Sequence, residues 1–102
     1  MKISKQYVIR EILGEHIIVP TGQEAIRFQG IIAVNETGAF LVRYLQEHDA
    51  DEEELTQALC RDFEIDSGTA RKDIEDFIES VHRQGVLLVE EKKKISKFKP
   101  YL

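Results

Sequence analysis

The spacing of hydrophobic residues changes character near residue 35 of the chain. Before that point, residues 31–34 form a short, mostly β-branched apolar run, which is typical of a strand. After it, apolar residues recur at helical spacing as Ala39, Phe40, Leu41, Tyr44 and Leu45. Asn35 stands at the junction, and its side chain can accept hydrogen bonds from the free backbone donors of a starting helix. The pattern therefore predicts a strand over residues 31–34 and a first helix over residues 36–48.

An alternation of apolar and polar residues precedes this junction. Residues 7–13 and 16–20 are predicted to be two strands, and Gly14-Glu15 between them offers the tight turn of a β-hairpin. The Pro-Thr-Gly sequence that follows ends the second strand, because proline lacks a ladder donor and glycine frees the turn. Residues 23–29 fit either an extension of the third strand or a separate short segment, and the pattern leaves both open.

Two further helices follow the first. Asp51 predicts the start of the second helix, with Glu54 in the reciprocal capping position three residues later. Asp66 predicts the start of the third helix and Gly85 its end. The inward-facing residues are Leu55, Ala58, Leu59 and Phe63 in the second helix, and Ala70, Ile74, Phe77, Ile78 and Val81 in the third. Residues 86–89 fit a last short strand.

This order of elements predicts an α+β, winged-helix-like fold, in which a small three-stranded antiparallel sheet is followed by a three-helix bundle. The length of 102 residues fits a single domain with one modest core. We assign residues 1–91 to this domain. Residues 92–102 form a basic tail, which we expect to be loosely ordered without a partner.

Composition, the N-terminal residues and the cysteine count indicate the cellular compartment. The content of 42% apolar and 32% charged residues is that of a globular protein, and no apolar run approaches the roughly 20 residues that span a bilayer. The N-terminal residues lack the uninterrupted apolar core of a secretory signal. A single cysteine, Cys60, cannot form an internal disulfide. We therefore expect a cytoplasmic protein without a membrane span.

Charge is distributed unevenly along the chain. Residues 46–80 hold thirteen Asp and Glu against three Lys and Arg, a net of −10, whereas residues 81–102 carry a net of +4. Tight binding to nucleic acid requires clustered Lys and Arg facing phosphates. Acidic second and third helices therefore weigh against a nucleic-acid partner, although the basic tail alone could still touch one.

No catalytic or metal-binding constellation stands out. His16, His48 and His82 are scattered, Cys60 stands alone, and there is no glycine-rich phosphate loop. The acidic run over residues 51–54 fits the positive end of a helix dipole better than a cation site. We therefore expect no enzymatic activity, no metal and no cofactor.

The most informative feature is an apolar strand near an apolar helix face. If residues 31–34 lie at an open edge of the sheet, their unpaired backbone groups could accept an extended peptide as a fourth strand. Inward side chains of that peptide could then fill a groove beside Ile74, Phe77, Ile78 and Val81. The same helix face could simply pack the domain's own core, and periodicity alone favours that interpretation.

The chain resembles the PqqD family, small peptide-binding domains also called RiPP recognition elements, over roughly residues 5–88. The matching segments are residues 7–12 with Gly14-Glu15, Val19-Pro20, residues 28–30, residues 34–40, residues 53–55, Asp73 with Phe77, and residues 85–87. Two positions depart from the family pattern: Val42 stands where tryptophan is frequent, and Gln29 where asparagine is common. The basic tail lies outside the pattern.

The resemblance implies a non-catalytic chaperone. It would bind the leader of a ribosomally made precursor peptide and present it to a modifying enzyme, frequently a radical SAM protein. In the family the leader joins the third strand and lies against the third helix. Carried over by position, the strand-addition contacts are Ile31, Ile32, Ala33 and Val34, the groove is lined by Ile74, Phe77, Ile78 and Val81, and Arg71 and Asp73 set polar selectivity at its rim.

Other functions stay open at this stage. A winged-helix transcriptional regulator would share the fold, but acidic residues on the third helix would repel phosphates. An adaptor that binds a folded partner through its sheet edge would show no preference for a leader sequence. An open edge is also compatible with a homodimer. The basic tail could contact the modifying enzyme or an acidic leader.

Overall fold

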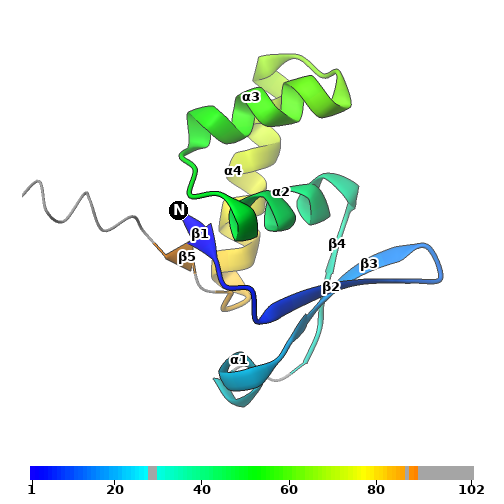
Figure 1. Cartoon of the computed structure of the whole chain (residues 1–102). Coiled ribbons are helices and arrows are strands. Elements are labelled where there is room, and N and C mark those ends of the chain that lie inside the picture. The colour runs from blue at the N-terminus through cyan, green and yellow to red at the C-terminus, as the bar shows by residue number, and fades with distance from the viewer. Residues whose placement is uncertain (28–29, 87, 90–102) are drawn as a thin grey trace, which may run out of the picture.

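The structure, a computed structural model, describes residues 1–27, 30–86 and 88–89 (Figure 1). In these residues a three-stranded sheet lies beside a set of helices, and a second, two-stranded sheet joins the two ends of the described chain. The elements are β1 (Lys2–Ile3), β2 (Tyr7–Ile12), β3 (Glu15–Pro20), α1 (Gly22–Arg27), β4 (Ile32–Val34), α2 (Glu36–Glu47), α3 (Glu52–Phe63), α4 (Ser67–Arg83) and β5 (Leu88–Val89). None of the described helices is long and apolar enough to cross a membrane.

The three-stranded sheet has the order β2-β3-β4, and both pairs are antiparallel. Ile17 of the central strand β3 pairs with Arg10 of β2 on one side and with Ala33 of β4 on the other. Because side chains alternate along a strand, Ile18 and Ile32 point together to the face that meets the helices, and both are buried. The predicted hairpin and third strand are present, but the two-residue turn of the hairpin is Leu13-Gly14, one residue earlier than the predicted Gly14-Glu15.

Each of the three long helices begins at a predicted cap. Asn35, Asp51 and Asp66 all have extended backbones and accept a hydrogen bond from the third residue that follows, at 2.8, 2.8 and 2.7 Å. The helix ends also follow the prediction: α4 stops at Arg83, and Gly85 has a φ of +91°.

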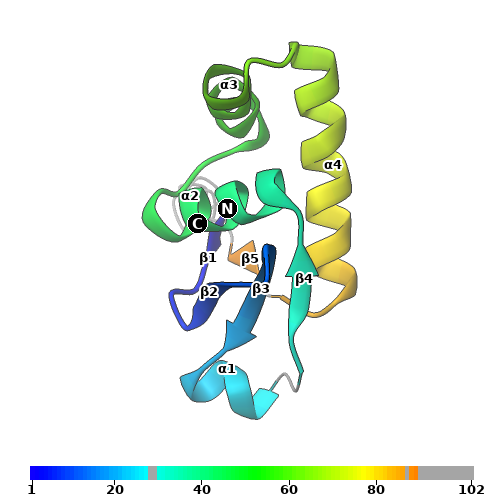
Figure 2. The ribbon, with the colours of Figure 1, turned by 90° about the vertical axis from the view of Figure 1, so that its right-hand side faces the viewer.

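The core lies between the sheet and the helices. It is built from the apolar stripes of α2, α3 and α4 together with Ile18 and Ile32 of the sheet. Val42, one of the two departures from the resembled family pattern, is fully buried, so its side chain is packed on all sides. Figure 2 shows α4 running past β4, while α3 lies at the far end of α4 from the sheet. The predicted α+β, winged-helix-like fold, with a three-stranded antiparallel sheet followed by three helices, is thus present.

Several local predictions need correction. Residues 22–27 form a short helix, so of the two interpretations left open for residues 23–29 the separate short segment is the one observed, while residues 28–29 lie outside the described residues. The third strand begins at Ile32, one residue later than predicted. The carboxylate of Glu54 does not complete a capping box with Asp51; it accepts a hydrogen bond from Tyr44 Oη at 2.7 Å, which raises the pKa of Tyr44.

The second sheet was only half predicted. Residues 88–89 form the last strand, but its antiparallel partner, β1, was not foreseen. The register pairs Lys2 with Val89 and Ile3 with Leu88. Ile3 is buried in the same core as the long helices, so the small sheet is packed into the domain. The basic tail, residues 92–102, lies outside the described residues.

Candidate functional site

The candidate site begins at the edge strand β4. This strand pairs with β3 on one side, and no strand in the described part of the chain pairs with its other side. None of its three residues is charged, and the chain turns directly from Val34 through the Asn35 cap into α2. An uncharged strand with one free edge is a template for another extended chain.

A groove with a volume of about 250 Å³ lies along this edge. One wall comes from β4 and the start of α2, and the other from the middle of α4 (Figure 2). The first wall consists of Ala33, Val34, Asn35, Thr37 and Gly38, and the second of Asp73, Asp76, Phe77, Ser80 and Val81. At about 30 Å³ per water, the space corresponds to roughly eight waters. It can take one or two side chains of an extended chain.

The first wall depends on a close approach between a strand and a helix. Asn35 Oδ1 accepts hydrogen bonds from the Gly38 amide at 2.8 Å and from the Thr37 hydroxyl at 3.1 Å. A Cβ atom on Gly38 would lie 3.0 Å from that oxygen and 3.2 Å from the Cβ of Val34. Glycine at this helical position therefore lets the end of β4 lie against the first turn of α2.

The second wall is a stripe of α4 that is displaced from the core stripe. Successive helical residues are rotated by about 100°, so the groove-lining positions are centred about 60° away from Ala70, Ile74, Phe77 and Val81. Phe77 and Val81 belong to both stripes. They are largely buried and form the apolar part of the groove, while Asp73, Asp76 and Ser80 form its polar margin.

The structure brings together half of the residues predicted to form the site. Ala33, Val34, Asp73, Phe77 and Val81 line the groove. Of the other five, Ile31 precedes the strand and is 61% exposed, Ile32 and Ile74 are buried in the core, and Ile78 packs against the core away from the groove. Arg71 lies beside α3.

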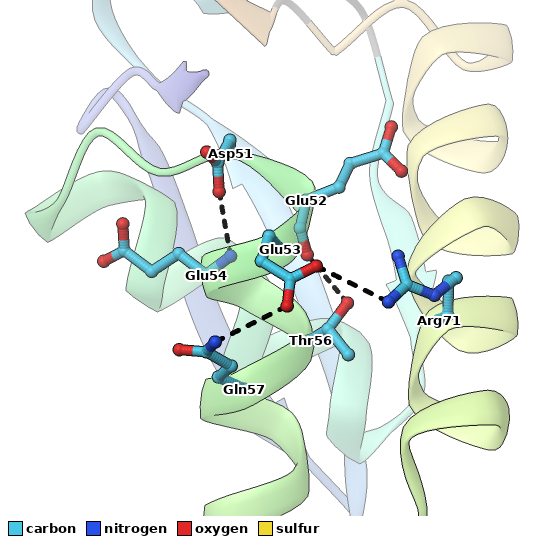
Figure 3. Close-up of polar contacts among 7 residues, drawn as sticks. All are labelled: Asp51, Glu52, Glu53, Glu54, Thr56, Gln57 and Arg71. Carbon is cyan, nitrogen blue, oxygen red and sulfur yellow. Dashed lines mark hydrogen bonds and ion pairs between the residues drawn. The ribbon is translucent and has the colours of Figure 1, made fainter.

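Arg71 has a partner of its own. Its guanidinium Nη2 lies 3.5 Å from Glu53 Oε1 at the start of α3, where Asp51 and Glu52 also lie (Figure 3). On the helical wheel of α4 it sits more than about 120° from the centre of the groove. Arg71 therefore connects two helices, and the acidic run of residues 51–54 supplies a cap and this ion pair. No group of acidic, His or Cys residues in the described chain could hold a metal ion.

Sequence reasoning missed five lining residues. Asn35 was identified as a helix cap, and neither it nor Thr37, Gly38, Asp76 or Ser80 was assigned to the site. A polar stripe offset from the apolar stripe of α4 was the available signal, because residues 73, 76 and 80 recur at helical spacing. The glycine in the first turn of a predicted helix was a second signal.

A second hollow adjoins the same strand. It is lined by Gly14, Glu15 and His16 at the hairpin and by residues 33–36. His16 Nδ1 is buried there and has no hydrogen-bond partner within the described chain. The end of β4 therefore borders two hollows.

The fold and the groove define the class: a small winged-helix-like α+β domain with an open edge strand beside a helix. Residues 15–87 match the family model described as Coenzyme PQQ synthesis protein D (PqqD). The match covers more than half of the chain, and the chain therefore belongs to the PqqD family.

A solved structure shares the fold. It is described as TbiB1 in complex with the TbiA(beta) leader peptide, and the superposition has a TM-score of 0.63. The similarity covers 89% of this chain and 99% of that one, at 22% sequence identity. No curated protein matches the chain significantly.

Proposed function

We propose that this chain is a non-catalytic chaperone for a ribosomally synthesised precursor peptide. It binds the leader segment as an additional strand on β4 and presents the peptide to a modifying enzyme, a radical SAM protein in the most specific form of the proposal. The observation that carries this proposal is the uncharged open edge of β4 beside the groove of α4. The solved neighbour is a complex with a leader peptide, which supports the same ligand here.

The backbone of β4 would supply affinity and the groove selectivity. Main-chain hydrogen bonds form along an added strand whatever its sequence, whereas every second side chain points toward one face. We propose Ala33 and Val34 as strand-addition contacts, with Ile31 extending the edge and Ile32 holding the strand in the core. Phe77 and Val81 would receive the inward side chains, supported from behind by the packing of Ile74 and Ile78.

Duplex DNA is a poorer partner for the same fold. A winged-helix regulator would offer α4 to phosphates, but this helix carries Asp73, Glu75, Asp76 and Glu79. Its three Lys and Arg side chains each lie within 4 Å of a carboxylate. The electrostatic attraction that dominates DNA binding is therefore missing from this surface.

The decisive experiment changes the peptide rather than the protein. Proline at Ile32 would test strand addition badly, because this residue is 1% exposed and its disruption would disturb the core. We would instead methylate single backbone amides of a leader peptide encoded beside the gene and measure affinity by titration calorimetry. In strand addition only alternate amides face β4, so methylation should weaken binding about tenfold or more at every second residue.

The intervening positions are the matched controls, because methylation there leaves the strand pairing intact. Backbone amide NMR shifts on binding should concentrate in β4 and in the groove-lining part of α4. Uniform losses at all positions, or shifts concentrated along β2, would contradict the proposal.

A further inference from the structure

The two walls of the groove differ in charge. Provided that the proposed function holds, this difference restricts which peptides can bind. Its floor is apolar, from Val34, Phe77 and Val81, and its α4 margin carries the carboxylates of Asp73 and Asp76. The opposite wall carries no charged side chain. An inward-facing side chain of a bound peptide would therefore lie within reach of both apolar surface and negative charge.

The charge of this margin is only partly neutralised by the protein itself. On α4, Arg71 pairs with Glu53 at 3.5 Å, and Arg83 lies 3.9 Å from Glu79. Lys72 lies 3.7 Å from Asp76, but both side chains are mostly exposed, and such surface pairs contribute little because solvent screens them. Asp73 has no cation within 4 Å among the described residues.

Asp73 is also the more enclosed of the two carboxylates. It is half-buried, between the helix and the open strand, whereas Asp76 is exposed. The oxygen of Asn35 on the opposite wall is already occupied by Gly38 and Thr37. An ion pair formed in such a partly desolvated site is screened less than one on the open surface.

We propose that this groove selects peptides with a Lys or Arg at an inward-facing position, two residues from an apolar side chain. The methylene stem of the basic residue lies along Phe77 and Val81, and its cationic end reaches Asp73 and Asp76. The period of two follows from strand geometry, which returns every second side chain to the same face. An acidic residue at the same position is rejected because like charges would meet.

The test is selection from a displayed library of random peptides, about 12 residues long, on the full chain at low salt. Enriched peptides should carry Lys or Arg at one position, several-fold above the library frequency, with an apolar residue two positions away. Selection on the Asp73→Asn, Asp76→Asn double variant should lose the basic preference and keep the apolar one. Glu75→Gln is the matched control, because it removes one acidic charge from the opposite side of α4 and should leave both preferences unchanged.

Affinity measurements on one enriched peptide, made synthetically, give a quantitative test of the basic preference. Replacing its basic residue by norleucine should weaken binding to the natural chain roughly three- to tenfold, and by much less at about 1 M salt. On the Asp73→Asn, Asp76→Asn double variant the two peptides should bind almost equally. Equal binding to the natural chain, or the same ratio on the variant, would overturn the inference.

Failure of the two proposals can be told apart. If enriched peptides show alternating sensitivity to backbone methylation but no basic preference, strand addition stands and only the selectivity is wrong. If no peptide is enriched, the peptide-binding function itself is wrong. If enriched peptides show no alternating sensitivity to methylation, binding by strand addition is wrong. Far-ultraviolet circular dichroism would check that each variant is folded. We expect it to be, because Asp73 and Asp76 make no hydrogen bond that holds two elements together in the described chain.

Discussion

The two edges of the three-stranded sheet differ in a way that explains why only one of them is a candidate site. β2 is twice as long as β4, six residues against three. Yet Arg10 and Glu11 stand exposed in its second half, and Gln46 of α2 donates hydrogen bonds to the carbonyl oxygens of Ser4 and Tyr7 at its start. Charged side chains are a common protection of edge strands.

Among the described residues, β4 has neither the charged side chains of β2 nor hydrogen bonds like those from Gln46, and α4 lies beside it instead. Its residues are uncharged, and α4 closes the groove along its free side. The comparison teaches that length does not make an edge strand into a binding site. An added chain needs both open backbone groups and a wall that receives its side chains.

The largest expected effect concerns the close approach that shapes the β4 edge. Gly38→Ala would place a methyl group 3.2 Å from the Val34 Cβ and 3.0 Å from the capping oxygen of Asn35. We expect the free energy of unfolding to fall by about 1–3 kcal/mol and peptide binding to weaken with it. Chemical denaturation and peptide titration measure the two effects.

Gly68→Ala is the matched control for this substitution. Gly68 also lies in the first turn of a helix, but its Cβ would meet only Asp66 Oδ1 at an ordinary 3.4 Å. Replacing a helical glycine by alanine normally stabilises a helix by up to about 1 kcal/mol. If both alanine variants were stabilised, the crowding at Val34 would be an incorrect explanation.

An intermediate effect is expected from exchanging the charges of the two edges. Arg10 and Ala33 are equivalent positions, one on each side of Ile17, and both are exposed. Ala33→Arg would place a protective charge on β4, and we expect peptide affinity to fall two- to fivefold, from a cross-strand effect of about 0.5–1 kcal/mol.

Arg10→Ala makes the reciprocal change on β2. It should leave peptide affinity unchanged and increase self-association, which sedimentation over a range of protein concentrations would detect. The contrast between the edges would be refuted if Arg10→Ala weakened peptide binding as much as Ala33→Arg.

The smallest effect concerns pH and the helix that walls the groove. The Thr69 amide donates a hydrogen bond to Asp66 at 2.7 Å, and this bond holds the pKa of Asp66 below its ordinary value of 3.8. A lowered carboxyl pKa adds stability above pH 3.8, and this stability is lost as the pH falls through the folded-state pKa. We therefore expect the NMR shift of the Thr69 amide to titrate below pH 3.8.

The first turn of α2 provides the internal control. Its cap, Asn35, is an amide that does not titrate in this range, so the Gly38 amide should not follow the same curve. Equal titration of both amides would mean that acid unfolds the whole domain rather than releasing one cap.

The sequence predicted the long elements well because local chemistry decides them. Asn35, Asp51 and Asp66 each offer a side-chain acceptor directly before an apolar periodic segment, and each is a cap in the structure. The hairpin was also predicted, but its turn was placed one residue late, because Leu13 shares the positive φ of Gly14 and a leucine gives no sequence signal for that conformation.

The missed parts depend on contacts between distant segments. β1 has only two residues, and it is a strand because residues 88–89 pair with it. The groove was found only in part because the periodicity of α4 marks its core stripe, while the wall facing β4 is rotated from that stripe by about 60°. Arg71 was assigned to the rim by position alone, and the partner that draws it away, Glu53, lies on another helix.

The pairing of β1 with β5 also bears on the order in which the chain folds. Ile3 pairs with Leu88, so this small sheet can form only after nearly the whole domain has been synthesised and α4 has returned the chain to its beginning. Contacts this distant in sequence close long loops and are slow to form, whereas the hairpin of β2 and β3 closes across two residues. On a ribosome, the hairpin and the open β4 edge would exist before β1 and β5 can pair. Until α4 has been synthesised, a nascent β4 edge would lack the helix that forms the second wall of its groove.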